Sequence, residues 1–124
     1  MTRSLLLATL LVLVSSAAMA QDAVKADPKH YNVEMENDHV RVLRIHYGAH
    51  EKSVMHEHPA SVAIFLSDGD VKFTLPDGKT NDAHFKAGQT MWEDPGKHLP
   101  ENTGDKPFDL ILVELKTAKH ATAH

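Results

Sequence analysis

Two histidines, His56 and His58, are separated by a single residue in the segment VMHEHPASVAIF. In a β-strand, residues i and i+2 project from the same face, so two imidazoles at this spacing can reach a common point. Neutral imidazole is a common ligand of transition metals. The pair therefore supplies half of a candidate metal site. Surface strands carry the same pattern without a metal, so the pair alone does not decide between these interpretations.

A third histidine, His98, follows a Pro-Gly turn in GQTMWEDPGKHLPEN, about 40 residues after His58. Asn102, just beyond it, is interpreted as a turn or backbone-bonding residue rather than a ligand. His50 lies shortly before the first pair and is a minor candidate for the same site. The remaining histidines are interpreted as solvated or hydrogen-bonded surface residues, because histidine is usually partly exposed: they are His30, His39, His46, His84, His120 and His124.

These two segments together resemble the two sequence motifs of the cupin superfamily. The matching residues are Gly48, His56, His58 and Gly69 in the first motif and Gly88, Pro95, Gly96, His98 and Asn102 in the second. The resemblance covers roughly residues 35–116 and implies a small antiparallel jelly-roll barrel with a metal site inside one end. Within the superfamily, the chain resembles small single-domain exported cupins, some of which are named for beta-alanine degradation (BauB-like).

The chain departs from the cupin motif at the position of its acidic ligand. The motif has a glutamate four or five residues after the second histidine, where this chain has Val62 and Ala63. The ligand set implied by the resemblance is therefore His56, His58 and His98, without a carboxylate. Three neutral nitrogen ligands suit Fe, Zn, Ni or Cu better than Mg or Mn. They also leave coordination positions open for water or substrate.

Nearby acidic residues are candidates to complete this site. Glu93 and Glu101 are considered as hydrogen-bond partners of a ligand or as a distant fourth ligand. Glu57 alternates away from the two histidines in the strand and is expected to face outward.

Three functional hypotheses remain open from the sequence, and none identifies a catalytic residue. The first is an exported small cupin that binds a divalent transition metal and has a pocket for an unknown small molecule. The second is a three-histidine non-haem iron dioxygenase acting on a small organic substrate, as in cupins with a similar ligand set. The third is a metal-free cupin that serves as a binding module.

Alternating apolar and polar residues recur along the chain in HVRVLRIHYG, SVAIFLSDGD and FDLILVELK, with turn signals such as Asp77-Gly78 between the runs. Period-two alternation and short strands between Gly and Pro turns are typical of β-barrels and β-sandwiches. We therefore expect an all-β chain with little helix, which agrees with the single-domain jelly-roll barrel of antiparallel strands that the resemblance implies. Side-chain expectations are core positions for Phe65, Phe73, Phe85 and Phe108, a core or rim position for Trp92, and solvent exposure for Arg41 and Arg44.

The first twenty residues, MTRSLLLATLLVLVSSAAMA, have a basic start, an apolar core and a small-residue end. This layout is typical of a secretory signal peptide, and the apolar core is shorter than the roughly 20 residues that cross a bilayer. We expect cleavage after Ala20 and a periplasmic or secreted protein without membrane contact. The other predicted segments are an N-terminal extension (21–34), a cupin domain (35–116) and a C-terminal tail (117–124), with residues 21–29 and the tail lacking strand patterning.

The composition excludes several classes of protein. Seventeen acidic residues outnumber thirteen basic ones, and no basic cluster provides a surface for nucleic acid. The absence of cysteine excludes disulfides, thiolate catalysis and cysteine-ligated zinc. The length allows one domain. A homodimer formed through an edge strand is a further expectation, since exposed β-edges need covering.

Overall fold

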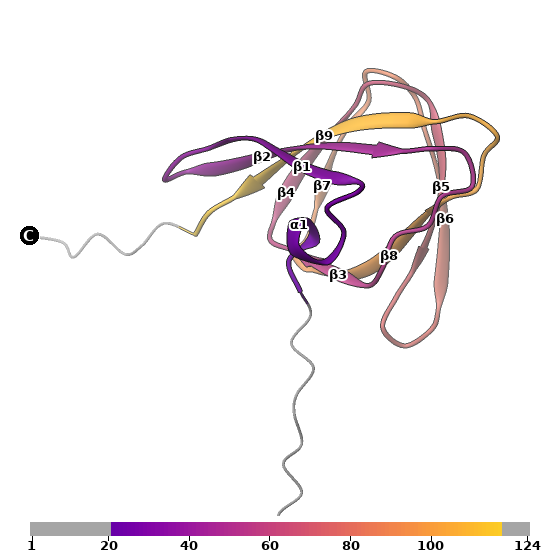
Figure 1. Cartoon of the computed structure of the whole chain (residues 1–124), viewed down its shortest axis with the longest axis horizontal. Helices are drawn as coiled ribbons and strands as arrows, with labels where there is room; N and C mark the ends of the chain where they lie inside the picture. Colours follow the sequence, from indigo (N-terminus) through magenta and orange to yellow (C-terminus); the bar gives the residue numbers. More distant parts are fainter. Residues whose placement is uncertain (1–20, 118–124) are drawn as a thin grey trace, which may run out of the picture.

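The computed structural model describes residues 21–117, and the predicted signal peptide and residues 118–124 lie outside the described part. Two antiparallel sheets curve around a common interior (Figure 1). The larger sheet has the spatial order β1 (Tyr31–Glu36), β2 (Val40–Tyr47), β9 (Phe108–Leu115), β4 (Ser61–Phe65) and β7 (Thr90–Glu93). The smaller sheet has the order β3 (His56–His58), β8 (Gly96–Asn102), β5 (Gly69–Thr74) and β6 (Thr80–Phe85).

This architecture confirms the predicted all-β, antiparallel fold. Every pair of named strands runs antiparallel, and residues 21–117 contain one short helix, α1 (Ala23–Ala26). The two sheets are not joined into one closed, hydrogen-bonded barrel. The predicted turn at Asp77-Gly78 connects β5 to β6, where Gly78 adopts a positive φ of 85° that favours glycine. Among residues 21–117, no helix has the length and apolar character required to cross a membrane.

The core lies between the two sheets and is built from alternating strand positions. On β9, every second residue from Phe108 to Glu114 is buried. Phe65 of the larger sheet stacks on Phe85 of the smaller one, with ring centroids 3.9 Å apart and planes 10° from parallel. Of the four phenylalanines predicted for the core, these three are buried, while Phe73 is half-buried. The stacked pair of Phe65 and Phe85 therefore helps to hold the two sheets together.

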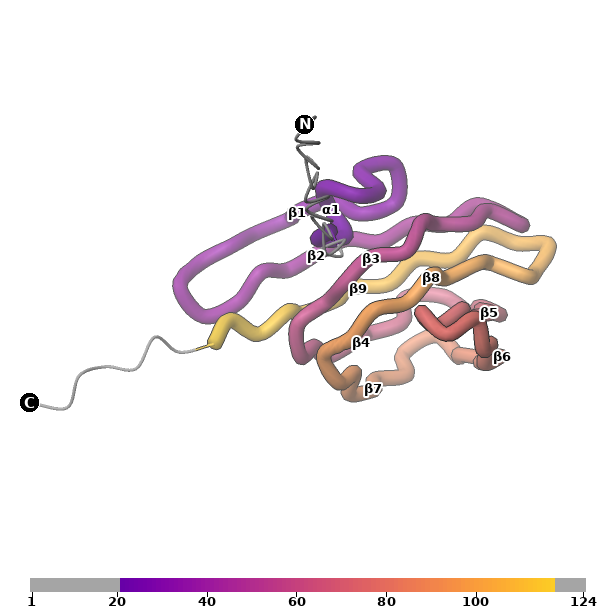
Figure 2. The backbone as a smooth tube through the Cα atoms, turned by 90° about the horizontal axis from the view of Figure 1, so that it is seen from below, coloured from indigo at the N-terminus to yellow at the C-terminus, as the bar shows by residue number. Residues whose placement is uncertain are grey.

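The N-terminal segment is packed against the sheets, whereas the sequence pattern indicated a segment without regular structure. Asp22 caps α1 by accepting a hydrogen bond from the Val24 N–H at 3.2 Å, and Ala23 is fully buried. The Glu57 N–H donates to the Gln21 carbonyl at 3.0 Å, so the segment lies along β3 (Figure 2). Its contacts are with residues distant in the sequence, which local periodicity cannot reveal.

Trp92 lies on the outer surface rather than in the core or at its rim. Its side chain is 53% exposed, and its indole N–H donates to Asp94 at 2.9 Å. The flanking residues Met91 and Glu93 are both more buried, as strand alternation requires. The outward phase of this short strand explains why the expectation was wrong.

Candidate metal centre

The three predicted ligand histidines come together on two neighbouring strands of the smaller sheet. His56 and His58 of β3 are buried, while Glu57 between them is exposed, as predicted. β3 pairs with β8, and His56 lies directly across from His98 in this register. Directly opposed residues of an antiparallel pair have Cβ atoms roughly 4.5–5.5 Å apart. The strand pairing therefore places the third histidine beside the first.

The imidazole rings converge in a way that suits one ion. One ring nitrogen from each histidine lies within 4.8 Å of the other two. Three atoms this close share a point no more than about 2.8 Å from each. A shift of less than one ångström per ring would therefore give the ~2.1 Å of a metal–nitrogen bond. The ring planes meet at 73–88°, so the rings surround a point instead of stacking.

Hydrogen bonds at the Nδ1 atoms of His56 and His58 leave the Nε2 atoms of these two rings available for a ligand. His56 Nδ1 donates to the Val54 carbonyl at 2.8 Å, because a carbonyl can only accept. His56 Nε2 and His98 Nε2 are buried and have no hydrogen-bond partner among the described residues. Buried polar atoms without a partner are costly and rare. A cation bound between the rings would satisfy them, so the donor set fits a metal.

The protonation states of His56 and His98 also suit metal binding. Burial and the neighbouring His58 lower the pKa of His56 to about 4. Burial, followed by the charges of His58 and His56, lowers the pKa of His98 to about 3. Both rings are therefore neutral at pH 7, which is the form that coordinates metal ions.

Glu114 is a buried carboxylate at the centre that the sequence analysis did not identify. Its side chain is 2% exposed, and its Oε2 accepts a hydrogen bond from His58 Nδ1 at 2.8 Å. The other oxygen, Oε1, accepts from Arg41 Nε at 2.6 Å. A carboxylate on Nδ1 fixes the tautomer and orientation of a ligating histidine and directs Nε2 toward the metal. Arg41 is 19% exposed and part of this buried network, so the prediction of a solvent-exposed arginine was wrong.

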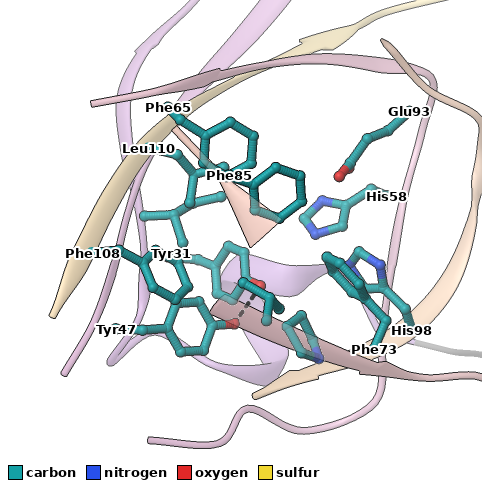
Figure 3. Close-up of a pocket in the computed structure, with 13 residues that line it drawn as sticks. Tyr31, Tyr47, His58, Phe65, Phe73, Phe85, Glu93, His98, Phe108 and Leu110 are labelled. Carbon is teal, nitrogen blue, oxygen red and sulfur yellow. Dashed lines mark hydrogen bonds between the residues drawn. The ribbon is translucent and has the colours of Figure 1, made fainter. Parts of the chain in front are cut away.

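A small cavity of about 30 Å³ adjoins the histidines in the protein interior. Figure 3 shows His58, His98 and Glu93 along one wall and aromatic rings along the opposite wall. Two aromatic residues hold ligand rings in place: Tyr31 packs edge-on against His56 with centroids 4.7 Å apart, and Phe73 stacks on His98 at 5.2 Å. The volume suffices for one or two water-sized molecules beside the open side of the centre.

The other candidates for completing the site occupy different places. Glu93 lines the cavity, and burial raises the pKa of its carboxyl, although it is not among the three groups that converge. Glu101 lies three residues from His98 along β8, therefore on the opposite face, where it pairs with Lys72 at 3.0 Å. His50 is exposed and pairs with Asp105 at 2.7 Å. Of these three candidates, Glu93 is the one that lies in the cavity beside the centre.

The missing motif glutamate leaves a small apolar residue in the interior. Ala63 is fully buried and Val62 is only partly buried, so Ala63 occupies the inward position of the two. Ser61, also buried, pairs across the sheet with Glu93 on β7 and with Glu114 on β9. The carboxylates on this side of the centre therefore come from strands β7 and β9 rather than from the motif position.

The structure agrees with the roles predicted for Asn102 and for most of the remaining histidines, but not for His30. Asn102 bonds backbone groups, as predicted, by donating to the carbonyls of Gly48 and Lys106 at 3.0 and 2.8 Å. The exposed residues His39, His46 and His84 agree with their surface assignment. His30 does not, because it is 4% exposed and stacked on Tyr47. His120 and His124 lie outside the described residues.

No protein-family model and no curated protein matches this sequence. Several solved structures share its fold. A cupin domain protein from Bordetella pertussis has a TM-score of 0.66 at 20% identity, covering 70% of this chain and 92% of its own. A Klebsiella pneumoniae protein with a double-stranded β-helix domain has a TM-score of 0.56 at 24% identity, covering 68% and 74%.

An RmlC-like cupin family protein from Methanocaldococcus jannaschii has a TM-score of 0.55 at 22% identity, covering 72% of this chain and 83% of its own. Similarity at this level of identity establishes the fold alone. The chain thus has the double-stranded β-helix fold of the cupins. Inside this fold, His56, His58 and His98 form a cluster able to hold a metal ion.

Proposed function

We propose that this protein is an exported metal-binding cupin in which His56, His58 and His98 hold one divalent transition metal. Two observations carry the proposal together: one ring nitrogen from each of the three histidines lies within 4.8 Å of the other two, and the buried Nε2 atoms of His56 and His98 have no hydrogen-bond partner among the described residues. The neighbouring cavity of about 30 Å³ leaves room for a water-sized ligand at the open side of the metal. A bound ion would supply Lewis-acid or redox chemistry there.

The donor set narrows the metal to Fe, Zn, Ni or Cu. Three imidazoles provide no negative charge and no oxygen ligand, which disfavours Mg and Ca. Glu93 is the one acidic side chain that lines the cavity, and Glu114 holds His58 from behind. The three histidines would therefore bind the metal, and Glu114 would orient His58. The open coordination positions are left to water or a small ligand.

Elemental analysis of the mature protein, purified without an affinity tag, tests this proposal. We expect about one equivalent of a transition metal, bound by three protein ligands as in a site with an open position, and loss of most of it in His98→Ala. His84→Ala is the matched control, because His84 is exposed on β6, where it pairs with Asp70, which is also exposed. Metal well below one equivalent in the wild type, even after reconstitution, would refute the proposal and favour the metal-free binding module.

A second candidate function is a three-histidine iron dioxygenase acting on a small organic substrate. The observation that favours it is the water-sized cavity bordered by His58, His98 and Glu93, which leaves space for dioxygen at the open side of the centre. An organic substrate would require this cavity to widen. Oxygen consumption by the iron-loaded protein with thiols, diketones and small acids distinguishes this function from metal binding alone. No oxygen uptake with any of these substrates would contradict it.

The homodimer stays a prediction. β1 is an outer strand of the larger sheet, and its Val33 and Met35 are 44% and 49% exposed. Outer strands with apolar residues invite pairing with another strand. Sedimentation of the wild type and of Met35→Lys would test it, with a dimer expected for the former and a monomer for the latter.

A further inference from the structure

The N-terminal segment lies against the strand that carries two of the three histidines. α1 contacts β1 and β3, as Figure 1 also shows. The Gln21 carbonyl accepts a hydrogen bond from Glu57 N–H, and Glu57 stands between His56 and His58. Two aspartates, Asp22 and Asp27, flank the helix. Each of them begins a chain of polar contacts that ends at one of the histidines.

The first chain runs from Asp22 to His58. Both oxygens of Asp22 accept from the guanidinium of Arg41, with one of these bonds at 3.2 Å. Arg41 Nε donates to Glu114 Oε1 at 2.6 Å, and Glu114 Oε2 accepts from His58 Nδ1 at 2.8 Å. A guanidinium held at both ends keeps its fork in one orientation. Asp22 therefore fixes the arginine that fixes the carboxylate on His58.

The second chain runs from Asp27 to His56. Asp27 is buried and accepts from His30 Nδ1 and from the Ser53 hydroxyl, both at 2.6 Å. Ser53 Oγ lies 3.4 Å from His56 Nδ1, beside the stronger bond to the Val54 carbonyl. His30 is itself held by stacking on Tyr47, with ring centroids 4.4 Å apart and planes 7° from parallel. Asp27 thus anchors the loop that supports the Nδ1 side of His56.

We infer that residues 21–27 are a positioning element of the metal centre, acting through Arg41–Glu114 on His58 and through Ser53 on His56. This inference rests on the proposed metal-binding function and assigns Asp22 and Asp27 the role of positioning residues. Neither aspartate belongs to the three residues that would hold the ion. Each holds a partner that keeps one Nε2 atom directed toward the other two histidines, so that the centre is assembled before a metal arrives.

Metal affinity of four single variants tests the inference. Outer partners of ligating histidines typically change affinity by roughly 10- to 100-fold. Asp27 acts one contact further out than such a partner, through Ser53, and Asp22 acts two contacts further out, through Arg41 and Glu114. We therefore expect Asp22→Asn and Asp27→Asn each to weaken Co²⁺ or Zn²⁺ binding by about 3- to 10-fold. The matched controls Glu34→Gln and Asp70→Asn, which break exposed pairs with Arg44 and His84, should stay within about twofold of wild type.

A spectroscopic measurement on the metal-free protein separates positioning from simple stabilisation. Nitrogen NMR of ¹⁵N-histidine distinguishes bare from protonated ring nitrogens, and the wild type should show protonated Nδ1 and bare Nε2 at His56 and His58. Asp22→Asn should alter the His58 signals, and Asp27→Asn those of His56. Variants that lower the melting temperature but keep the wild-type affinity and ring signals would overturn the inference. If the wild type binds no metal, the proposed function fails, and the ring signals still decide the inference by themselves.

Discussion

Replacing Glu114 by glutamine tests whether the buried carboxylate orients His58 for metal binding. The carboxylate accepts from His58 on one oxygen and from Arg41 on the other. Glutamine keeps the shape but has one carbonyl oxygen, so it can accept from only one of these two donors. The other donor then faces an NH₂ group inside the protein. The substitution therefore removes one charge-assisted hydrogen bond without creating a cavity.

The expected magnitudes follow from this geometry. A buried donor left without an acceptor costs about 1–3 kcal/mol of unfolding free energy. Loss of a carboxylate partner of a ligating histidine lowers metal affinity by about 10- to 100-fold, which corresponds to about 1.4–2.8 kcal/mol. We expect both effects in Glu114→Gln, measured by urea unfolding of the metal-free protein and by Zn²⁺ competition with a chromophoric chelator.

Asp109→Asn is the matched control for this prediction. Asp109 lies on the same strand, β9, and accepts from His46 Nδ1 at the same 2.8 Å, but both side chains are about half exposed. Exposed pairs of this kind contribute at most about 1 kcal/mol, and His46 is not among the groups that converge at the centre. We expect little change in either measurement. If Glu114→Gln binds zinc as tightly as wild type while losing stability, the carboxylate serves packing alone and the reasoning is wrong.

Three further predictions concern the fold around the site. Folding lowers the pKa values of His56 and His98 from about 6.5 to about 4 and about 3. Below pH 6.5 the unfolded chain therefore binds more protons at these two histidines than the folded protein does. The metal-free protein should therefore be fully stable above that pH and lose on the order of 2 kcal/mol per histidine by pH 5 in urea titrations; equal stability at pH 7 and 5 would contradict this. Phe85→Ala should lower the unfolding free energy by about 3–5 kcal/mol, since it removes the ring stack between the sheets, and a loss below 1 kcal/mol would count against that contact. Of two motif glycines, Gly69→Ala should cost about 1–3 kcal/mol because its methyl group would meet a buried ring at 3.0 Å, whereas Gly96→Ala has open space and should be near neutral in thermal melts.

The sequence predicts the part of the site that depends on short-range rules. Strand alternation places His56 and His58 on one face and Glu57 on the other, and the structure agrees. The third histidine required the motif resemblance, because spacing along the chain does not determine that β3 and β8 are neighbours. Their register then sets His56 opposite His98. Strand alternation thus accounts for the pair His56 and His58, and the pairing of β3 with β8 accounts for the addition of His98.

The parts that escaped prediction depend on contacts between distant segments. Glu114 carried a usable signal, since it continues the inward, apolar phase of FDLILVEL and a carboxylate at such a position needs a buried partner. Its partners, His58 and Arg41, are 56 and 73 residues away. The docking of the N-terminal segment carried no comparable signal, because its short polar sequence has no periodicity and its stability comes from residues of β2, β3 and the Ser53 loop.

Anomalous diffraction from crystals of the protein reconstituted with Zn²⁺ or Co²⁺ tests the central claim most directly. The account predicts one peak at the metal absorption edge, bound by the Nε2 atoms of His56, His58 and His98 at about 2.0–2.1 Å. Nδ1 of His58 should stay on Glu114. Three results would contradict the assignment of these three histidines as the metal centre. They are a peak elsewhere in the protein, coordination through Nδ1, and the absence of any peak in crystals grown with excess metal.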